Sequence, residues 1–151
     1  MSKIEVGDLL YEANLSITKL TEFGVGIVDA TSPDAELPAA GARFDIFVAG
    51  TVRGSRIDGT IEAIDYLHVR ADRRSQLHIH GAITTADGSN IALYADGVAL
   101  PDEAPGIFQL RENVTLTTVA SEFDWVNQLQ IWGQGTVDMN TLQIEISGYV
   151  A

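Results

Sequence analysis

Apolar and polar residues alternate along most of the chain, and this period of two is typical of β-strands. The first strands are expected at residues 9–20 and 22–28, with a bend between them. Further strands are expected at residues 43–49, 56–63, 66–71, 76–85, 90–98, 113–120, 126–132 and 141–149. Helical periodicity is nearly absent, so the pattern predicts about ten short strands.

Turn-forming residues separate these segments. Asp87-Gly88 is the sharpest signal, because a two-residue hairpin turn requires positive φ angles that Gly and Asp tolerate well. Prolines mark loops over residues 29–41 and 100–106. Many short strands joined by turns, with no helices between them, favour an antiparallel sandwich or an up-and-down barrel. We expect an all-β fold, most simply a single antiparallel β-barrel, because closure removes exposed strand edges.

Length and composition are consistent with one globular domain over residues 1–151. The chain has a mass of 16.2 kDa, and 46% of its residues are hydrophobic while 20% are charged. This balance lies far from that of disordered chains. A single core is therefore sufficient to hold the chain together.

The charge balance narrows the range of partners. Nine Lys and Arg residues stand against 21 Asp and Glu residues, which gives a formal net charge of -12. Such a chain repels phosphate backbones and anionic lipid surfaces, so neither nucleic acid nor a membrane is an expected partner. The sequence has no cysteine and no recognisable secretory signal or membrane-spanning apolar run. A cytoplasmic location is expected.

From about Gly41 onward, a series of short segments resembles the bacterial family called domain of unknown function 3237. The segments are Ala49-Gly50-Thr51-Val52-Arg53-Gly54, Asp58-Gly59-Thr60, Ile64-Asp65-Tyr66, Thr85-Ala86-Asp87-Gly88, Phe123-Asp124-Trp125-Val126-Asn127 and Gly133-Gln134-Gly135. The resemblance implies a small antiparallel barrel, lipocalin-like in shape and often oligomeric, with no generally assigned activity. The chain differs from the family at His78 and His80, where an aspartate and an arginine are usual.

His78 and His80 are the most suggestive candidates for chemistry. They lie two residues apart on one predicted strand, so both project from the same face. Imidazole titrates near neutrality, and a pair that lines the barrel would serve as general acid and base. The alternative is a pair of exposed strand histidines. A metal site would need a third ligand such as His68 or Asp65, and no standard zinc spacing is present, so no metal and no cofactor are expected.

Asp65 is the candidate base. On a regular strand it faces the same way as Leu67 and Val69, a costly position for a carboxylate unless it is paired or functional. The alternative is a turn aspartate that caps a break between Ala63 and Tyr66.

Other side chains are candidates for contact with a ligand. Arg70, together with Arg43, offers a planar guanidinium for a carbonyl or anionic group, although surface exposure is the commoner role of arginine. Aromatic residues suited to line an apolar cavity, or equally to fill a core, include Tyr66, Tyr94 and Trp125. Asn127 shares the face of Trp125 and would add a polar group.

Three functions fit these observations. The first is an enzyme of isomerase, cyclase, hydratase or lyase type that uses acid and base groups in the barrel lumen on a small, partly apolar metabolite. In it His78 and His80 shuttle protons, Asp65 orients or deprotonates, and Arg70 and Asn127 stabilise an oxyanion. The second is a non-catalytic carrier or sensor of a small ligand. The third is a homo-oligomeric scaffold with a filled interior.

Overall fold

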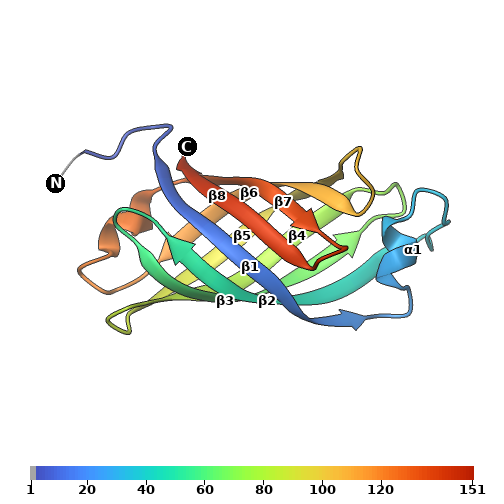
Figure 1. Ribbon diagram of the computed structural model, residues 1–151, viewed down its shortest axis with the longest axis horizontal. Helices are drawn as coiled ribbons and strands as arrows, with labels where there is room; N and C mark the ends of the chain where they lie inside the picture. Colours follow the sequence, from blue (N-terminus) through green and yellow to red (C-terminus); the bar gives the residue numbers. More distant parts are fainter. Residues whose placement is uncertain (1–2) are drawn as a thin grey trace.

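Eight antiparallel strands form a closed barrel in the computed structural model, which describes residues 3–151 (Figure 1). The strands are β1 (Leu9–Glu22), β2 (Ala42–Arg53), β3 (Asp58–Val69), β4 (Ser75–Thr85), β5 (Asn90–Pro101), β6 (Ile107–Thr117), β7 (Ile131–Asp138) and β8 (Gln143–Val150). Each strand pairs with the next along the chain, and β8 pairs with β1. The all-β, single-barrel prediction is confirmed.

The strand count of about ten was slightly too high, for identifiable reasons. Residues 56–63 and 66–71 belong to one continuous strand, β3, rather than to two. Residues 22–28 contain no separate strand, because a bend leads into the short helix α1 (Ile27–Thr31). Residues 126–132 are divided between the 3₁₀ helix η1 (Asp124–Gln128) and the start of β7.

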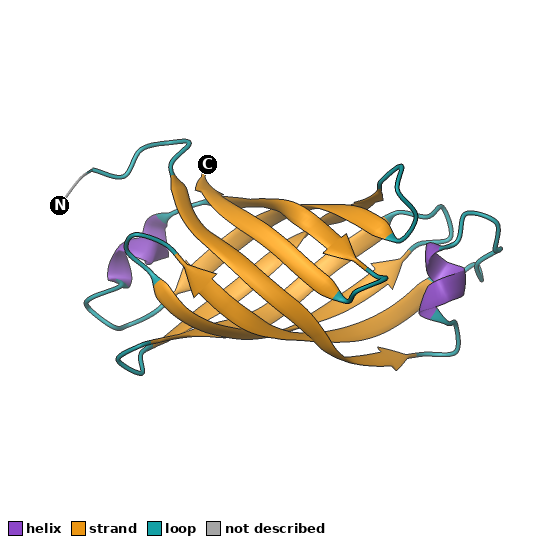
Figure 2. Ribbon diagram, in the orientation of Figure 1, coloured by secondary structure: helices purple, strands orange, loops and turns teal. Residues whose placement is uncertain are grey.

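Short helices cover the two ends of the barrel. Figure 2 shows α1 at one end and η1 at the other. The helix α1 is fixed at both of its ends: Glu22 Oε2 accepts a hydrogen bond from the Ile27 amide at 2.6 Å, and Arg73 Nη1 donates to the Ala30 carbonyl at 3.1 Å. None of the helices within residues 3–151 is long and apolar enough to cross a membrane.

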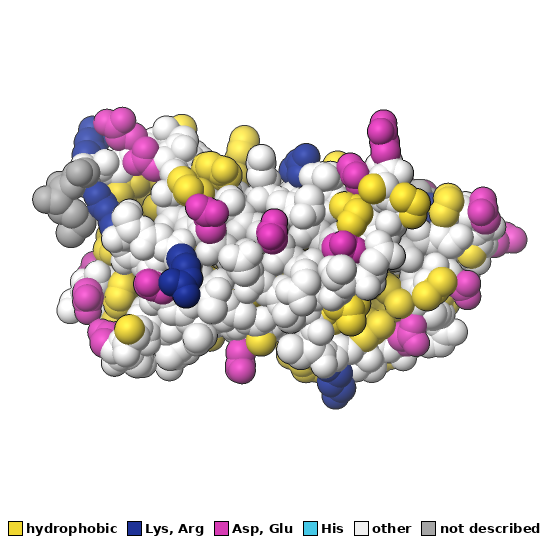
Figure 3. All heavy atoms as spheres, in the orientation of Figure 1, with side chains coloured by type: hydrophobic (Ala, Val, Ile, Leu, Met, Phe, Trp, Pro, Cys, Tyr) yellow, Lys and Arg dark blue, Asp and Glu magenta, His cyan; other side chains and the backbone are white. Residues whose placement is uncertain are grey.

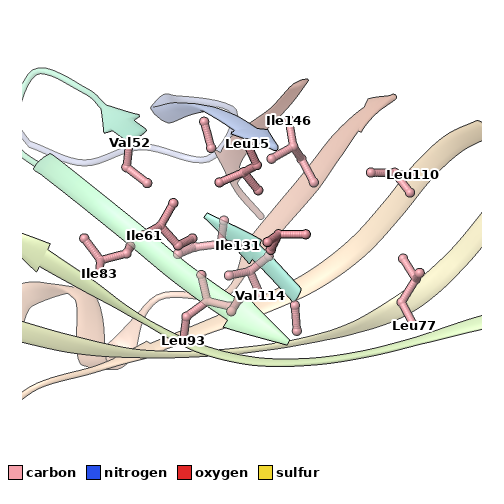
Figure 4. Close-up of a cluster of buried hydrophobic side chains, with 14 of the residues drawn as sticks. Leu15, Val52, Ile61, Leu77, Ile83, Leu93, Leu110, Val114, Ile131 and Ile146 are labelled. Atoms are coloured by element: carbon pink, nitrogen blue, oxygen red, sulfur yellow. The ribbon is translucent and has the colours of Figure 1, made fainter. Parts of the chain in front are cut away.

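Alternation along the strands places the core inside the barrel. Figure 4 shows buried side chains from several strands, among them Ile83, Ile131 and Val52, directed into the interior. The half of the barrel next to η1 is tightly filled, and Val126 of η1 is completely buried there. The outer surface carries many acidic side chains and few basic ones on the face visible in Figure 3.

The filled half should be sensitive to loss of volume. Ile83 is completely buried, so Ile83→Ala is expected to lower the free energy of unfolding by about 3 kcal/mol, through lost burial and a residual cavity. The exposed Thr60→Ala is the control, expected to change it by less than about 0.5 kcal/mol. Urea unfolding monitored by circular dichroism measures both, and equal effects of the two substitutions would contradict the burial of Ile83 in the core.

Candidate functional site

The half of the barrel next to α1 contains a partly open cavity of about 110 Å³. Ile27 and Thr31 of α1 form part of its wall. A cavity of about 150 Å³ in another protein holds a benzene molecule, so this one is of the size for a small cyclic compound or several waters. The lining is almost entirely aliphatic. Within residues 3–151, the lining residues with polar side-chain groups are Tyr11, Thr31, Asp65, Ser75 and Glu112.

Asp65 enters this cavity from β3. It is 9% exposed and shares its inward face with Leu67 and Val69, as the alternation predicted. Its Oδ1 accepts a hydrogen bond from the backbone amide of His78 at 3.0 Å. The β3–β4 ladder is interrupted here, between the pairs Asp65–Ile79 and His68–Gln76. The carboxyl group therefore satisfies an amide of β4 with one oxygen and leaves the other toward the cavity.

Burial changes the acidity of Asp65. Desolvation of the charged form raises its pKa to about 7, although the hydrogen bond from the His78 amide acts in the opposite direction. A carboxyl group with a pKa near neutrality is ionised in part of the molecules at physiological pH. This is the property expected of a general base.

Glu112 is a second carboxyl group in the same cavity. It lies on the inward face of β6, between Leu110 and Val114. Burial raises its pKa to about 8, and the nearby charge of Asp65 adds to the effect. Burial of both groups in one cavity, together with their mutual repulsion, makes the pair retain protons to a higher pH than isolated carboxyl groups do.

Tyr11 of β1 is a third ionisable group that borders the cavity. The ring is buried, and desolvation together with the charge of Glu112 raises the pKa of its phenol far above the usual value. The phenol is therefore a permanent hydrogen-bond donor. No side-chain polar atom among residues 3–151 is fully enclosed without a partner, and Tyr11 and Glu112 have no protein hydrogen bond there. Their oxygen atoms therefore have access to the cavity.

Glycines make room between Tyr11 and Glu112. The register of the strands gives a row of inward positions in which Glu112 is paired with Gly133, Gly133 with Gly148, and Gly148 with Tyr11. A Cβ atom on Gly148 would overlap the Tyr11 ring, and one on Gly133 would lie 3.3 Å from Glu112 Oε1. The absence of side chains at these two positions lets both polar groups lie along the barrel wall.

The histidines occupy the opposite face of the sheet. His78 and His80 are exposed on the outside of β4, whereas Leu77 and Ile83 point inward. The expectation that the pair lines the lumen is therefore wrong, and the alternative, exposed strand histidines, describes the structure. The His80 ring makes edge contacts with Tyr66 and Tyr94 at centroid distances of 6.1 and 5.0 Å.

The other predicted ligand contacts also lie outside the cavity. Tyr66 and Tyr94 are on outward positions of their strands, and Arg70 forms an exposed ion pair with Asp72 at 2.5 Å. Trp125 and Asn127 belong to η1 at the other end of the barrel, where Asn127 holds the backbone of Thr118 through two hydrogen bonds of 2.8 Å. Of the predicted site residues, only Asp65 reaches the cavity.

His68 and Asp65 do not assemble a metal site with the histidine pair. His68 is directed outward from β3, and its Nε2 lies 3.1 Å from the Ala40 carbonyl oxygen. No group of three or more His, Asp or Glu residues in the described part of the chain is arranged to hold a metal ion.

Glu112 and Tyr11 were missed from the sequence. The strand that contains Glu112 was expected to begin at residue 113, whereas β6 begins at Ile107. The alternation that places Glu112 on an inward face was visible in the sequence, because Leu110, Glu112 and Val114 follow the period of two. Tyr11, Ala13 and Leu15 follow the same period. Alternation thus identifies the polar groups at inward positions.

The fold and cavity define a small up-and-down β-barrel with an ionisable interior. The chain belongs to the family described as Protein of unknown function (DUF3237), whose model matches residues 38–151. The resemblance that we found in the sequence is therefore confirmed. No curated protein matches the sequence.

Solved structures share the architecture. A protein of unknown function from Clostridium acetobutylicum ATCC 824 has 20% identity and a TM-score of 0.77, covering 95% of this chain and 97% of that one. A β-barrel-like protein from Acinetobacter baumannii AYE has 17% identity and a TM-score of 0.73, covering 99% and 97%. A protein described as an enzyme from Penicillium herquei has 18% identity and a TM-score of 0.63, covering 100% and 99%. At these identities the likeness shows the fold alone.

The raised pKa of Glu112 makes stability depend on pH. The pKa is 4.5 as the ordinary value and about 8 in the folded protein, so between these values the folded state binds more protons than the unfolded state. The free energy of unfolding therefore falls as pH rises through this window. Glu112→Gln is expected to remove part of this fall. At pH about 9 its free energy of unfolding is expected to exceed that of the wild type by an amount on the order of 3 kcal/mol.

Urea unfolding at acidic, neutral and alkaline pH measures this difference. Glu62→Gln is the matched control, because Glu62 is exposed on the outer face of β3. Parallel pH–stability curves for the two variants would show that Glu112 does not titrate in a buried environment.

Proposed function

We propose that this barrel is a small-molecule enzyme that transfers protons in its lumen, with Asp65 as general base and Glu112 as general acid. The observation that supports it is the presence of two carboxyl groups in one aliphatic cavity whose lining has no Lys, Arg or His within residues 3–151. The expected substrate is a small, partly apolar metabolite. The chemistry needs no cofactor, since an acid, a base and a shaped pocket are sufficient.

The two carboxyl groups are suited to different roles. Asp65, with a pKa of about 7, is available as a carboxylate that removes a proton, while Glu112, with a pKa of about 8, retains a proton that it can donate. When Asp65 takes a proton from carbon or oxygen of the substrate, Glu112 can donate one to the atom that becomes negative. Isomerisation, cyclisation, hydration and elimination all follow this scheme.

The location of the two carboxyl groups also favours an enzyme over a carrier of small ligands. An apolar ligand needs only the aliphatic wall, and buried carboxyl groups without a cationic partner weaken a protein that merely carries such a ligand. A similar barrel is described as an enzyme from Penicillium herquei, which supports the compatibility of this fold with catalysis. A carrier or sensor is the second candidate, favoured by the mainly aliphatic lining. A homo-oligomeric state and a cytoplasmic location stay predictions from the sequence.

The proposal predicts loss of activity when Asp65 becomes neutral. A small β,γ-unsaturated cyclic ketone, 3-cyclopentenone, is a suitable probe, since its conversion to the conjugated isomer requires only removal and return of a proton and is followed by ultraviolet absorbance. Asp65→Asn keeps an acceptor for the His78 amide and is expected to lower kcat/KM at least about 100-fold. His78→Gln and His80→Gln, both outside the lumen, are expected to stay within about twofold of the wild type.

The pH dependence gives an independent check. Activity should rise as Asp65 ionises near pH 7 and fall as Glu112 loses its proton near pH 8, whereas Glu112→Gln should have lower activity and no alkaline limb. If the wild type binds the probe in the lumen but neither isomerises it nor exchanges its α-hydrogens with deuterated solvent, the carrier function replaces the enzyme proposal.

A further inference from the structure

The side chains around the cavity also define which ligands it accepts. We infer that the lumen binds an uncharged cyclic carbonyl compound, holds its oxygen with the hydroxyl of Tyr11 and the carboxyl group of Glu112, and rejects anions. The inference depends on the proposed function only in the role that it gives Asp65 as the base. The binding itself depends on the shape and polarity of the cavity.

Size and lining set the apolar part of the ligand. The space of about 110 Å³ is bounded by aliphatic side chains from β1 to β8 and closed on one side by Ile27 of α1. An aliphatic or unsaturated ring buries its whole surface in such a cavity, which is favourable because apolar area leaves water. A charged or strongly hydrated ligand loses its hydration without equivalent partners.

The charges around the cavity exclude anions. Its described lining contains no Lys, Arg or His to pair with a carboxylate or phosphate. The carboxylate of Asp65, where it is ionised, would instead repel an anion across a medium of low dielectric constant. The formal net charge of -12 works in the same direction at longer range. An acidic metabolite or a phosphorylated one is therefore a poor ligand.

Two neutral donors face the cavity from neighbouring parts of the wall. Tyr11 and Glu112 lie in one row of inward positions, separated only by Gly133 and Gly148, and neither has a hydrogen-bond acceptor within residues 3–151. A carbonyl oxygen has two lone pairs and accepts two such hydrogen bonds. The same donors bind more strongly when charge develops on that oxygen, as it does when a proton leaves the adjacent carbon.

An ammonium ligand is the principal competitor, because it would pair with ionised Asp65. It fits less well for two reasons. Its charge would be buried against aliphatic side chains. It would also offer only donors to Tyr11 and Glu112, leaving both hydroxyl protons without an acceptor.

Binding of size-matched probes to the full-length protein tests the inference. Cyclopentanone, butanoate and cyclopentylammonium are titrated at neutral pH by NMR, and cyclopentanone is expected to bind at least about tenfold more tightly than either ion. The infrared C=O stretch of bound cyclopentanone reports hydrogen bonding. Tyr11→Phe is expected to move this band to higher frequency and to weaken binding by about tenfold. Tyr66→Phe is the matched control on the outer face and should change neither.

Each result has a definite meaning. Equal or tighter binding of butanoate or cyclopentylammonium, or no binding of cyclopentanone, overturns the inference. An unchanged C=O band in Tyr11→Phe overturns it as well. A shifted band without isomerisation of 3-cyclopentenone supports the ligand class while the proposed enzyme function fails. Isomerisation of that probe without such a shift supports the enzyme and overturns this inference.

Discussion

Closure of the barrel is the constraint on which the rest of the structure depends. Every strand is paired on both sides, so the register around the ring is fixed and successive side chains must alternate between the lumen and the surface. A slip of one residue in any strand would turn its whole apolar face toward water. Asp65 and Glu112 therefore stay inside, because they occupy inward positions of strands whose other inward residues need burial.

The enclosed carboxyl groups then acquire their properties from one another and from the wall. The aliphatic lining disfavours both negative charges, and each charge disfavours the other, so the pair retains a proton at a pH at which isolated carboxyl groups have none. Gly133 and Gly148 leave space in the lumen because they have no side chains. Side chains there would displace Tyr11 and crowd Glu112, and the hollow half of the barrel would lose its row of oxygen atoms.

Alternation in the sequence predicted the all-β class, with a sandwich or a barrel as the two architectures, and it placed Asp65 on the face of Leu67 and Val69 for a regular strand. The same alternation indicated that His78 points outward, because Leu77 and Ile83 are large apolar residues of the same strand and had to point inward. The error was to give weight to imidazole chemistry over the burial of those aliphatic neighbours. Glu112 was missed because loop residues around Pro105 hid the start of β6, and α1 was missed because its five residues are too few for a helical period. Distances across the lumen join residues far apart in sequence, so no local pattern could reveal them.

The two halves of the barrel serve different purposes in this arrangement. The base and the two donors project from β3, β6 and β1, whose positions are held by continuous pairing and by the tightly filled core next to η1. Groups on such strands keep their geometry better than groups on loops. The opposite end is covered by the short helix α1, which is held by hydrogen bonds with Glu22 and Arg73 and by the packing of Ala30 and Ile27 against the core. Rigid strands thus position the chemistry, and Ile27 and Thr31 of α1 bound the cavity at this end of the barrel.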